Sequence, residues 1–248
     1  MQRDMPQDQA SGLRELFARP AGPRVHALSC PNQEAFVLPI AHVLCHGLVE
    51  RAVRVAWIDE FDLGMRQDWP LPGPVRFDLS QSLMNHVPLA SSLQSLNPSL
   101  WYALSRRMAR VPTNVFPSLY QRLQAGSLVL DRVLLCLSTH LQRSLYHYHD
   151  AIHHTVLTAC GPQDLAQTRD WIFKVHAHQP AASWSVVLIG ADADQDAFAQ
   201  LAQSVEPLLG QPLQKLGHVA TQFPQGQLAG AWEAPLELRD MMMANLLA

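Results

Sequence analysis

The chain has 248 residues, of which 48% are hydrophobic and 16% are charged, and its formal net charge is −3. This length and composition suit one large α/β domain. The low charge excludes the broad basic surface that binding to DNA or RNA requires, so we expect no nucleic-acid partner. Residues 1–10 lack the apolar stretch of a signal peptide, and no apolar run approaches the roughly 20 residues that cross a bilayer. We therefore expect a cytoplasmic protein.

The first expected element is a short amphipathic helix. Asp8 is a suitable N-cap, and apolar residues recur at helical spacing as far as Phe17. Pro20 ends the pattern, and Ala-Gly-Pro at 21–23 forms a linker. Residues 1–20 are thus expected to form a helix that is peripheral to the main body.

The main domain, residues 21–234, is expected to begin with a βαβ unit. An apolar strand at 25–29 precedes a helix at 33–50 and a second strand at 53–59. In such a unit the two strands are parallel and the crossover is right-handed.

The rest of the chain continues this alternation. Further strands are expected at residues 75–79, 128–137, 155–159 and 186–189. Further helices are expected at residues 98–109, 115–125, 162–178 and 194–209, and a C-terminal one at 236–247 within the segment 235–248. The order predicts an α/β fold with a doubly wound, mostly parallel sheet flanked by helices. The four cysteines form no CxxC pair and are expected to be buried, reduced thiols.

The turn after the first strand is unusual. In nucleotide-binding α/β proteins this turn is a glycine-rich loop whose backbone N–H groups bind phosphate. Here residues 29–38 contain neither glycine nor lysine. Glu34 places a negative charge, and Phe36 places bulk, where a triphosphate would lie.

Four short phrases resemble one family. They are Asp-Gln-Ala-Ser-Gly-Leu-Arg at 8–14, Asp-Glu-Phe-Asp-Leu-Gly at 59–64, Asp-Arg-Val-Leu-Leu-Cys at 131–136 and Leu-Gly-His-Val at 216–219. These phrases are similar to motifs of the MinD/ParA-type deviant P-loop ATPases, and within these of the FlhG (FleN) regulators of flagellar number. The resemblance implies a MinD-like P-loop NTPase fold over about residues 8–220.

The same resemblance implies that the catalytic chemistry is lost. The family's loop, KGGVGKT, corresponds to Pro31, Asn32, Gln33, Glu34, Ala35, Phe36 and Val37. The family's strand aspartate becomes Cys136, and the asparagine that reads adenine falls near Gly190. Asp59 and Asp62 remain as vestiges, and we expect them to be solvated turn residues. The chain is therefore expected to be a pseudo-ATPase with no catalytic residue, cofactor or metal.

In FlhG proteins the N-terminal element docks on the signal-recognition-type GTPase FlhF and stimulates its GTPase. The resemblance implies an FlhF-like partner, which would be contacted by Asp8, Gln9, Ala10, Gly12, Leu13 and Arg14. Packing of this helix on its own domain is the alternative. The expected function is non-catalytic control of flagellar assembly, number or placement. The alternatives are an ATPase with a remodelled site and a MinD-like partner in another polar or envelope system, such as cellulose synthesis.

Two further features have competing interpretations. His149 with His153, and His42 with His46, have the i,i+4 spacing at which a helix can present two metal ligands, although a polar helix face explains both pairs. The apolar C-terminal segment corresponds to a membrane-targeting helix in the family. Because Arg239 is its only basic residue, we expect it to pack on the domain or on another protein chain, with at most weak membrane contact.

Overall fold

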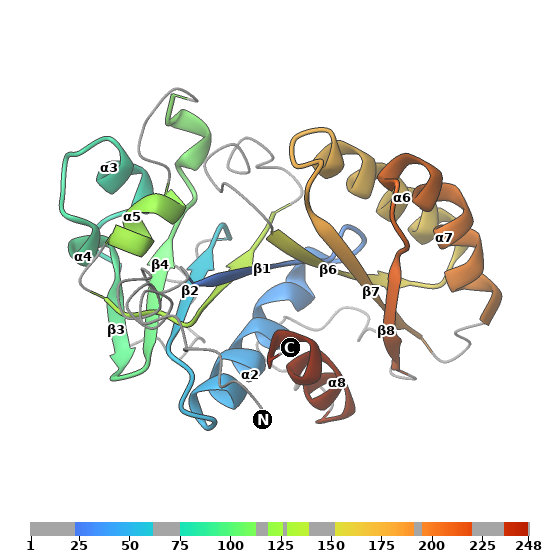
Figure 1. Ribbon diagram of the computed structural model, residues 1–248, viewed down its shortest axis with the longest axis horizontal. Coiled ribbons are helices and arrows are strands. Elements are labelled where there is room, and N and C mark those ends of the chain that lie inside the picture. Colours follow the sequence, from blue (N-terminus) through green and yellow to red (C-terminus); the bar gives the residue numbers. More distant parts are fainter. Residues whose placement is uncertain are drawn as a thin grey trace, which may run out of the picture.

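The computed structural model describes residues 23–61, 75–112, 119–125, 128–138, 152–190, 195–219 and 236–247, and it is built around one eight-stranded sheet (Figure 1). The strand order is β3-β4-β2-β5-β1-β6-β7-β8. All neighbouring strands pair in parallel except β3 and β4, which are antiparallel. The predicted fold class, a doubly wound and mostly parallel sheet, is confirmed.

The strands are β1 (Arg24–Ser29), β2 (Val55–Asp59), β3 (Gln94–Asn97), β4 (Leu100–Leu104), β5 (Arg132–Cys136), β6 (Ile152–Ala159), β7 (Ser183–Ile189) and β8 (Gln214–Val219). The α-helices are α2 (Val37–Val49), α3 (Leu79–Leu83), α4 (Leu89–Ser92), α5 (Leu119–Ala125), α6 (Pro162–His176), α7 (Gln195–Leu209) and α8 (Leu236–Leu247). Two short 3-10 helices are η1 (Glu34–Phe36) and η3 (Met108–Arg110).

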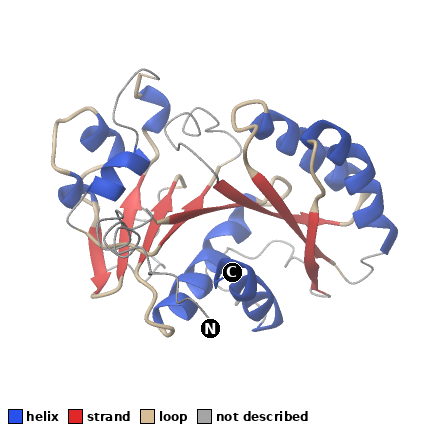
Figure 2. Cartoon of the chain, viewed as in Figure 1, coloured by secondary structure: helices blue, strands red, loops and turns tan. Residues whose placement is uncertain are grey.

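Helices cover both faces of the sheet, as Figures 1 and 2 show. Successive strand residues point to opposite faces, so β2 contributes Ala56 and Ile58 to one core and Trp57 to the other. The core that contains Trp57 lies under α2 and α8, whereas the other lies under α3, α5, α6 and α7. Burial on both faces explains why these strands are continuous apolar runs, and it is why they could be predicted from the sequence.

Two predicted elements are wrong. The helix expected at 98–109 is instead strand β4, because Leu100–Leu104 fits between β2 and β3 with Leu100, Tyr102 and Ala103 fully buried. The strand expected at 75–79 does not form, because Asp78 caps α3. Its Oδ1 accepts a hydrogen bond from the backbone N–H of Ser80 at 2.8 Å, and Gln81 completes a capping box.

The cysteines were predicted to be buried, reduced thiols, and this is confirmed for three of the four. Cys30, Cys45 and Cys136 are buried, Cys160 is half-buried, and none forms a disulfide.

Residues 1–20, with the expected docking helix, lie outside the described residues.

The C-terminal helix α8 packs on the domain, on α2 and β8, as predicted. Its buried side chains are Leu238, Met242, Met243 and Leu246. Two glycines permit this close approach. A Cβ atom on Gly47 of α2 would lie 3.3 Å from the Met243 sulfur, and one on Gly217 of β8 would overlap Met241. In the described part of the chain, no helix is long and apolar enough to span a bilayer.

Two adjacent leucines of α8 test this packing. Leu246 is 5% exposed and Leu247 is 40% exposed. We expect Leu246→Ala to lower the free energy of unfolding by about 2–3 kcal/mol, because it leaves a cavity in the core that α8 covers. Leu247→Ala should change it by less than about 0.5 kcal/mol. Urea unfolding followed by circular dichroism measures both, and equal effects would contradict the docked position of α8.

Candidate functional site at the carboxyl edge of the sheet

The carboxyl ends of the parallel strands meet at one edge of the sheet. Strand β1 lies at its centre, paired with β5 on one side and β6 on the other. The chain passes from β1 to β2 in one direction and from β6 to β7 in the other. The boundary between β1 and β6 is therefore a topological switch point, where ligands of open α/β sheets usually bind.

The Asn32 side chain forms hydrogen bonds across this switch point. It follows β1, and its side-chain oxygen accepts a hydrogen bond from the Thr158 hydroxyl of β6 at 2.9 Å. Its side-chain nitrogen donates to the backbone oxygen of Asp164 at 3.0 Å and to Oε1 of Gln167 at 3.1 Å, both in α6. The side chain thus ties the loop after β1 to the strand and helix on the far side of the crevice.

The rest of this loop is compact. Pro31 is half-buried and Gln33 is exposed, and the Gln33 carbonyl accepts a hydrogen bond from the backbone N–H of Phe36 at 3.1 Å. Phe36 and Val37 are buried in the core under α2, at 5% and 0% exposure. Phe36 therefore anchors the loop in the core. Ala35 lies between Glu34 and Phe36 in η1.

Carboxylates from two loops meet at the end of β5. The hydroxyl of Ser138 donates to Oε1 of Glu34 at 3.3 Å, and its backbone N–H donates to Oε2 of Glu60 at 2.9 Å. Glu60 is 2% exposed, so one of these carboxyl groups lies inside the protein. The carboxyl group that the sequence indicated at Glu34 is thus joined by a second one, at Glu60, which was not predicted.

Asp59 is buried, which corrects the expectation of a solvated turn residue. It is 0% exposed, its Oδ2 accepts a hydrogen bond from the Tyr102 hydroxyl at 2.5 Å, and its Oδ1 accepts one from the backbone N–H of Phe61 at 2.6 Å. Pairing of β2 with β4 places the tyrosine in reach. Asp62 lies outside the described residues.

Cys136 occupies a core position at the end of β5. It is fully buried, and Nε1 of Trp57 donates a hydrogen bond to its sulfur at 3.2 Å. Burial and the nearby charge of Asp59 raise the pKa of Cys136 well above its usual value. Burial likewise raises the pKa of Cys30, beside the loop, to about 12. Both thiols stay protonated at neutral pH and are poor nucleophiles.

Gly190, where the family's adenine-reading asparagine would fall, offers only backbone groups. Its carbonyl oxygen is 2.7 Å from Nε2 of His218 in β8, and its N–H donates to the Val219 carbonyl at 3.0 Å. Its φ of +148° is a conformation that favours glycine.

The expectation that His149 and His153 lie one turn apart on a helix is wrong for His153, which lies in β6 with His154. His149 lies outside the described residues. The two ring nitrogens of His153 are each 2.8 Å from a hydroxyl of β7, Nδ1 from Ser183 and Nε2 from Ser185. The β-branched residues that follow, and pairing with β1, make this segment a strand.

His154 is a core residue. Its Nε2–H group donates to Oε1 of Gln179 at 2.8 Å, and its ring stacks on Trp184 with the centroids 4.5 Å apart. Burial lowers the pKa of His154 to about 4, so it is neutral at pH 7.

His42 and His46 do lie one turn apart on α2, with ring centroids 4.4 Å apart. Burial, and then the charge of His46, lower the pKa of His42. Among the described residues, no group of three His, Cys, Asp or Glu side chains is placed to share a metal ion.

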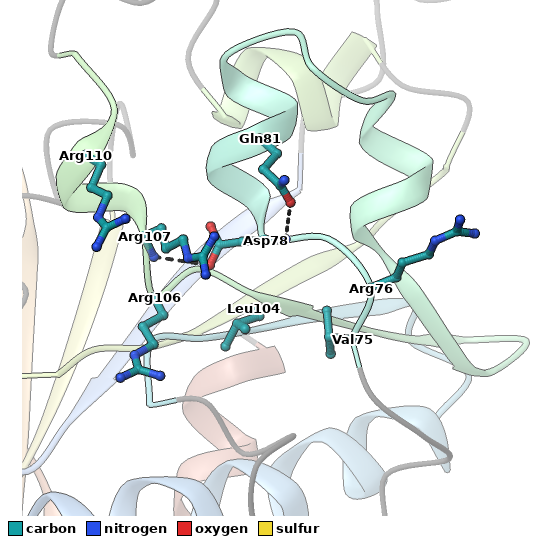
Figure 3. A pocket seen from close by; sticks show the side chains of 8 residues that line it. All are labelled: Val75, Arg76, Asp78, Gln81, Leu104, Arg106, Arg107 and Arg110. Carbon is teal, nitrogen blue, oxygen red and sulfur yellow. Dashed lines mark hydrogen bonds between the residues drawn. The ribbon is translucent and has the colours of Figure 1, made fainter.

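A basic pocket of about 420 Å³ lies farther along the same edge, at the end of β4 (Figure 3). Its charged side chains are Arg76, Asp78, Arg106, Arg107 and Arg110. The expected helix at 98–109 did not predict this pocket, because the pocket forms only where β4 pairs with β2 and ends beside the start of α3. The available signal was three arginines within five residues directly after an apolar run.

Comparisons with known proteins identify the fold. No protein-family model matches the sequence, and no curated protein does so either. Among solved structures, the chain is similar to a plasmid partition protein from Borrelia burgdorferi, with a TM-score of 0.63, 10% identity, and 92% of this chain and 99% of that one covered. It is also similar to apo McdA from Cyanthece, with a TM-score of 0.61, 13% identity, and 91% and 99% covered.

The MinD cell division protein of Aquifex aeolicus is a third similar structure, with a TM-score of 0.56, 10% identity, and 89% of this chain and 97% of that one covered. The chain therefore has the fold of the MinD/ParA-type ATPases, as the sequence phrases indicated. At these identities the similarity concerns the fold alone.

The contact between Asp59 and Tyr102 can be tested by a double-mutant cycle. Tyr102→Phe should lower the free energy of unfolding by about 1.5–3 kcal/mol, because a buried carboxylate loses a donor. With Asp59→Asn already present, the loss should be smaller by about 1 kcal/mol or more. Chemical denaturation of the four proteins gives this coupling, and strictly additive losses would mean that the two side chains are independent.

Proposed function

We propose that this chain is a MinD/ParA-like regulator that does not hydrolyse ATP and acts through contacts with other proteins. The supporting observation is that polar side chains at the switch point, and beside it at the end of β5, already form hydrogen bonds within the protein. The Asn32 side chain is hydrogen-bonded to β6 and α6, and Ser138 donates hydrogen bonds to both Glu34 and Glu60. A triphosphate would have to break these contacts.

The charge of the loop argues in the same direction. Phosphoryl transfer depends on cations and backbone N–H groups that stabilise negative charge. Residues 29–38 provide no lysine, arginine or glycine, and Glu34 carries a negative charge. The start of α6, a second possible phosphate site, is also acidic. The Asp164 carboxylate folds back so closely that a Cβ on Gly161 would lie 2.7 Å from its Oδ2.

We further propose that the regulator is FlhG-like and controls flagellar assembly, number or placement. This part rests on the phrase at 8–14, which resembles the FlhF-docking element, together with the MinD-type fold. Without a nucleotide-dependent switch, docking on an FlhF-like GTPase would be constitutive.

The first test is hydrolysis. Purified protein with Mg²⁺ and ATP should release phosphate no faster than a blank without protein, whereas an intact MinD gives a clear rate in the same assay. Mg²⁺-dependent hydrolysis that disappears in Asp59→Asn would overturn the proposal and favour an ATPase with a remodelled site. Phosphate release by a coupled enzyme assay is the measurement.

The second test is docking. Deleting residues 1–19, or changing Gln9 and Leu13 to alanine together, should reduce FlhF binding at least about tenfold, because the apolar and amide contacts of the helix are removed. Gln7→Ala, directly before the phrase, should leave binding unchanged. Pull-down and calorimetry with FlhF are the measurements. Equal binding by the truncated and full chains would refute the docking assignment.

A further inference from the structure

The pocket at the end of β4 has an unusual charge for this protein. Four arginines and one aspartate line it, in a chain whose formal net charge is −3. In Figure 3 the side chains of Arg106, Arg107 and Arg110 emerge from one short segment, whereas Arg76 extends to the opposite side. Three guanidinium groups are thus concentrated at one wall of a small cavity.

Among the described residues of the pocket, the carboxylate is that of Asp78, which accepts hydrogen bonds from backbone groups. Asp78 is 7% exposed, its Oδ1 accepts from the N–H of Ser80 at 2.8 Å, and its Oδ2 accepts from the N–H of Arg107 at 3.1 Å. It therefore fixes the backbone that carries the arginines. No described residue forms an ion pair with the guanidinium of Arg107 or Arg110.

We propose that this pocket binds a small, multiply charged phosphate ligand, such as a pyrophosphate group. Guanidinium groups match phosphate oxygens with paired hydrogen bonds, and several of them favour a ligand with more than one negative charge. The volume of about 420 Å³ is in the range of small-molecule sites.

Other anionic ligands fit less well. A nucleic acid needs basic residues spread along a face, but the same edge carries Glu34 and Glu60 beside β5. An acidic peptide needs an extended groove, whereas these arginines lie within five residues of chain. Among the described residues that line the pocket, the apolar ones are Val75 and Leu104, and none is aromatic and could stack on a base. The phosphate groups themselves are the part recognised.

This proposal does not rest on the function proposed above. The pocket lies after β4, whereas the closed switch point lies between β1 and β6. If the chain binds ATP without hydrolysing it, loss of that binding in the arginine variants would assign it to the pocket.

Isothermal titration of the full chain with sodium pyrophosphate, at constant ionic strength, tests the site. Wild type should bind with one site per chain. Arg107→Gln and Arg110→Gln together should weaken binding about a hundredfold, since each lost charge-assisted contact amounts to roughly a factor of ten. Neither change removes the backbone N–H that Asp78 holds.

Two variants serve as controls. Arg107→Lys keeps the charge but loses the planar fork, so it should weaken binding less than Arg107→Gln does. Arg169→Gln removes an arginine of α6 whose side chain is 42% exposed and paired with Asp170, and binding should stay within about twofold of wild type. Thermal unfolding confirms that every variant is folded.

Three results would overturn the proposal. One is no heat from wild type at millimolar pyrophosphate, and another is equal binding by wild type and the double variant. The third is a wild-type chain that does not bind pyrophosphate but binds a glutamate-rich peptide through Arg107 and Arg110. That result would make the pocket a site for binding another protein.

Discussion

The parallel pairing of β1 between β5 and β6 is the constraint on which the rest of the structure depends. It buries the central strand on both faces and brings the loops after β1, β2, β4, β5 and β6 to one edge. Polar groups at such an edge need partners, because an unpaired buried polar group costs about 1–3 kcal/mol. In a nucleotide-binding relative of this fold, phosphate can supply those partners. Here they are supplied internally, by Asn32 across the switch point and by Ser138 between Glu34 and Glu60.

The edge is divided by charge. Asp59, Glu60 and Glu34 lie around the ends of β1, β2 and β5, and the arginines lie beyond β4. Like charges repel and opposite charges attract over the few ångströms of such loops, so one half of the edge disfavours anions and the other favours them. An anionic ligand would thus bind beyond β4, at the part of this edge that is away from the switch point.

Much of the fold was predictable because burial leaves a clear pattern in the sequence. The runs at 25–29, 128–137 and 186–189 were predicted to be strands, and each contains strand residues that are buried on both faces of the sheet. The hairpin of β3 and β4 was not predictable, because β3 is polar and β4 is a short apolar run that periodicity alone does not distinguish from a helix. Because β4 was not predicted, two features of the site were not predicted either: the burial of Asp59 beside Tyr102 and the arginine pocket. Both form only when β4 pairs with β2.

The two halves of the edge are joined through this same pairing. Ser105, directly before the arginines, donates its backbone N–H to the carbonyl of Asp59 at 2.8 Å and its hydroxyl to the same oxygen at 3.3 Å. In the sheet Asp59 pairs with Leu104, and Tyr102, two residues before Leu104, donates a hydrogen bond to the Asp59 side chain. Backbone and side-chain hydrogen bonds therefore connect the segment that carries the pocket arginines to the end of β2. A ligand held by the arginines would therefore bear directly on the end of β2, and through the pairing of β2 with β5 on the centre of the sheet.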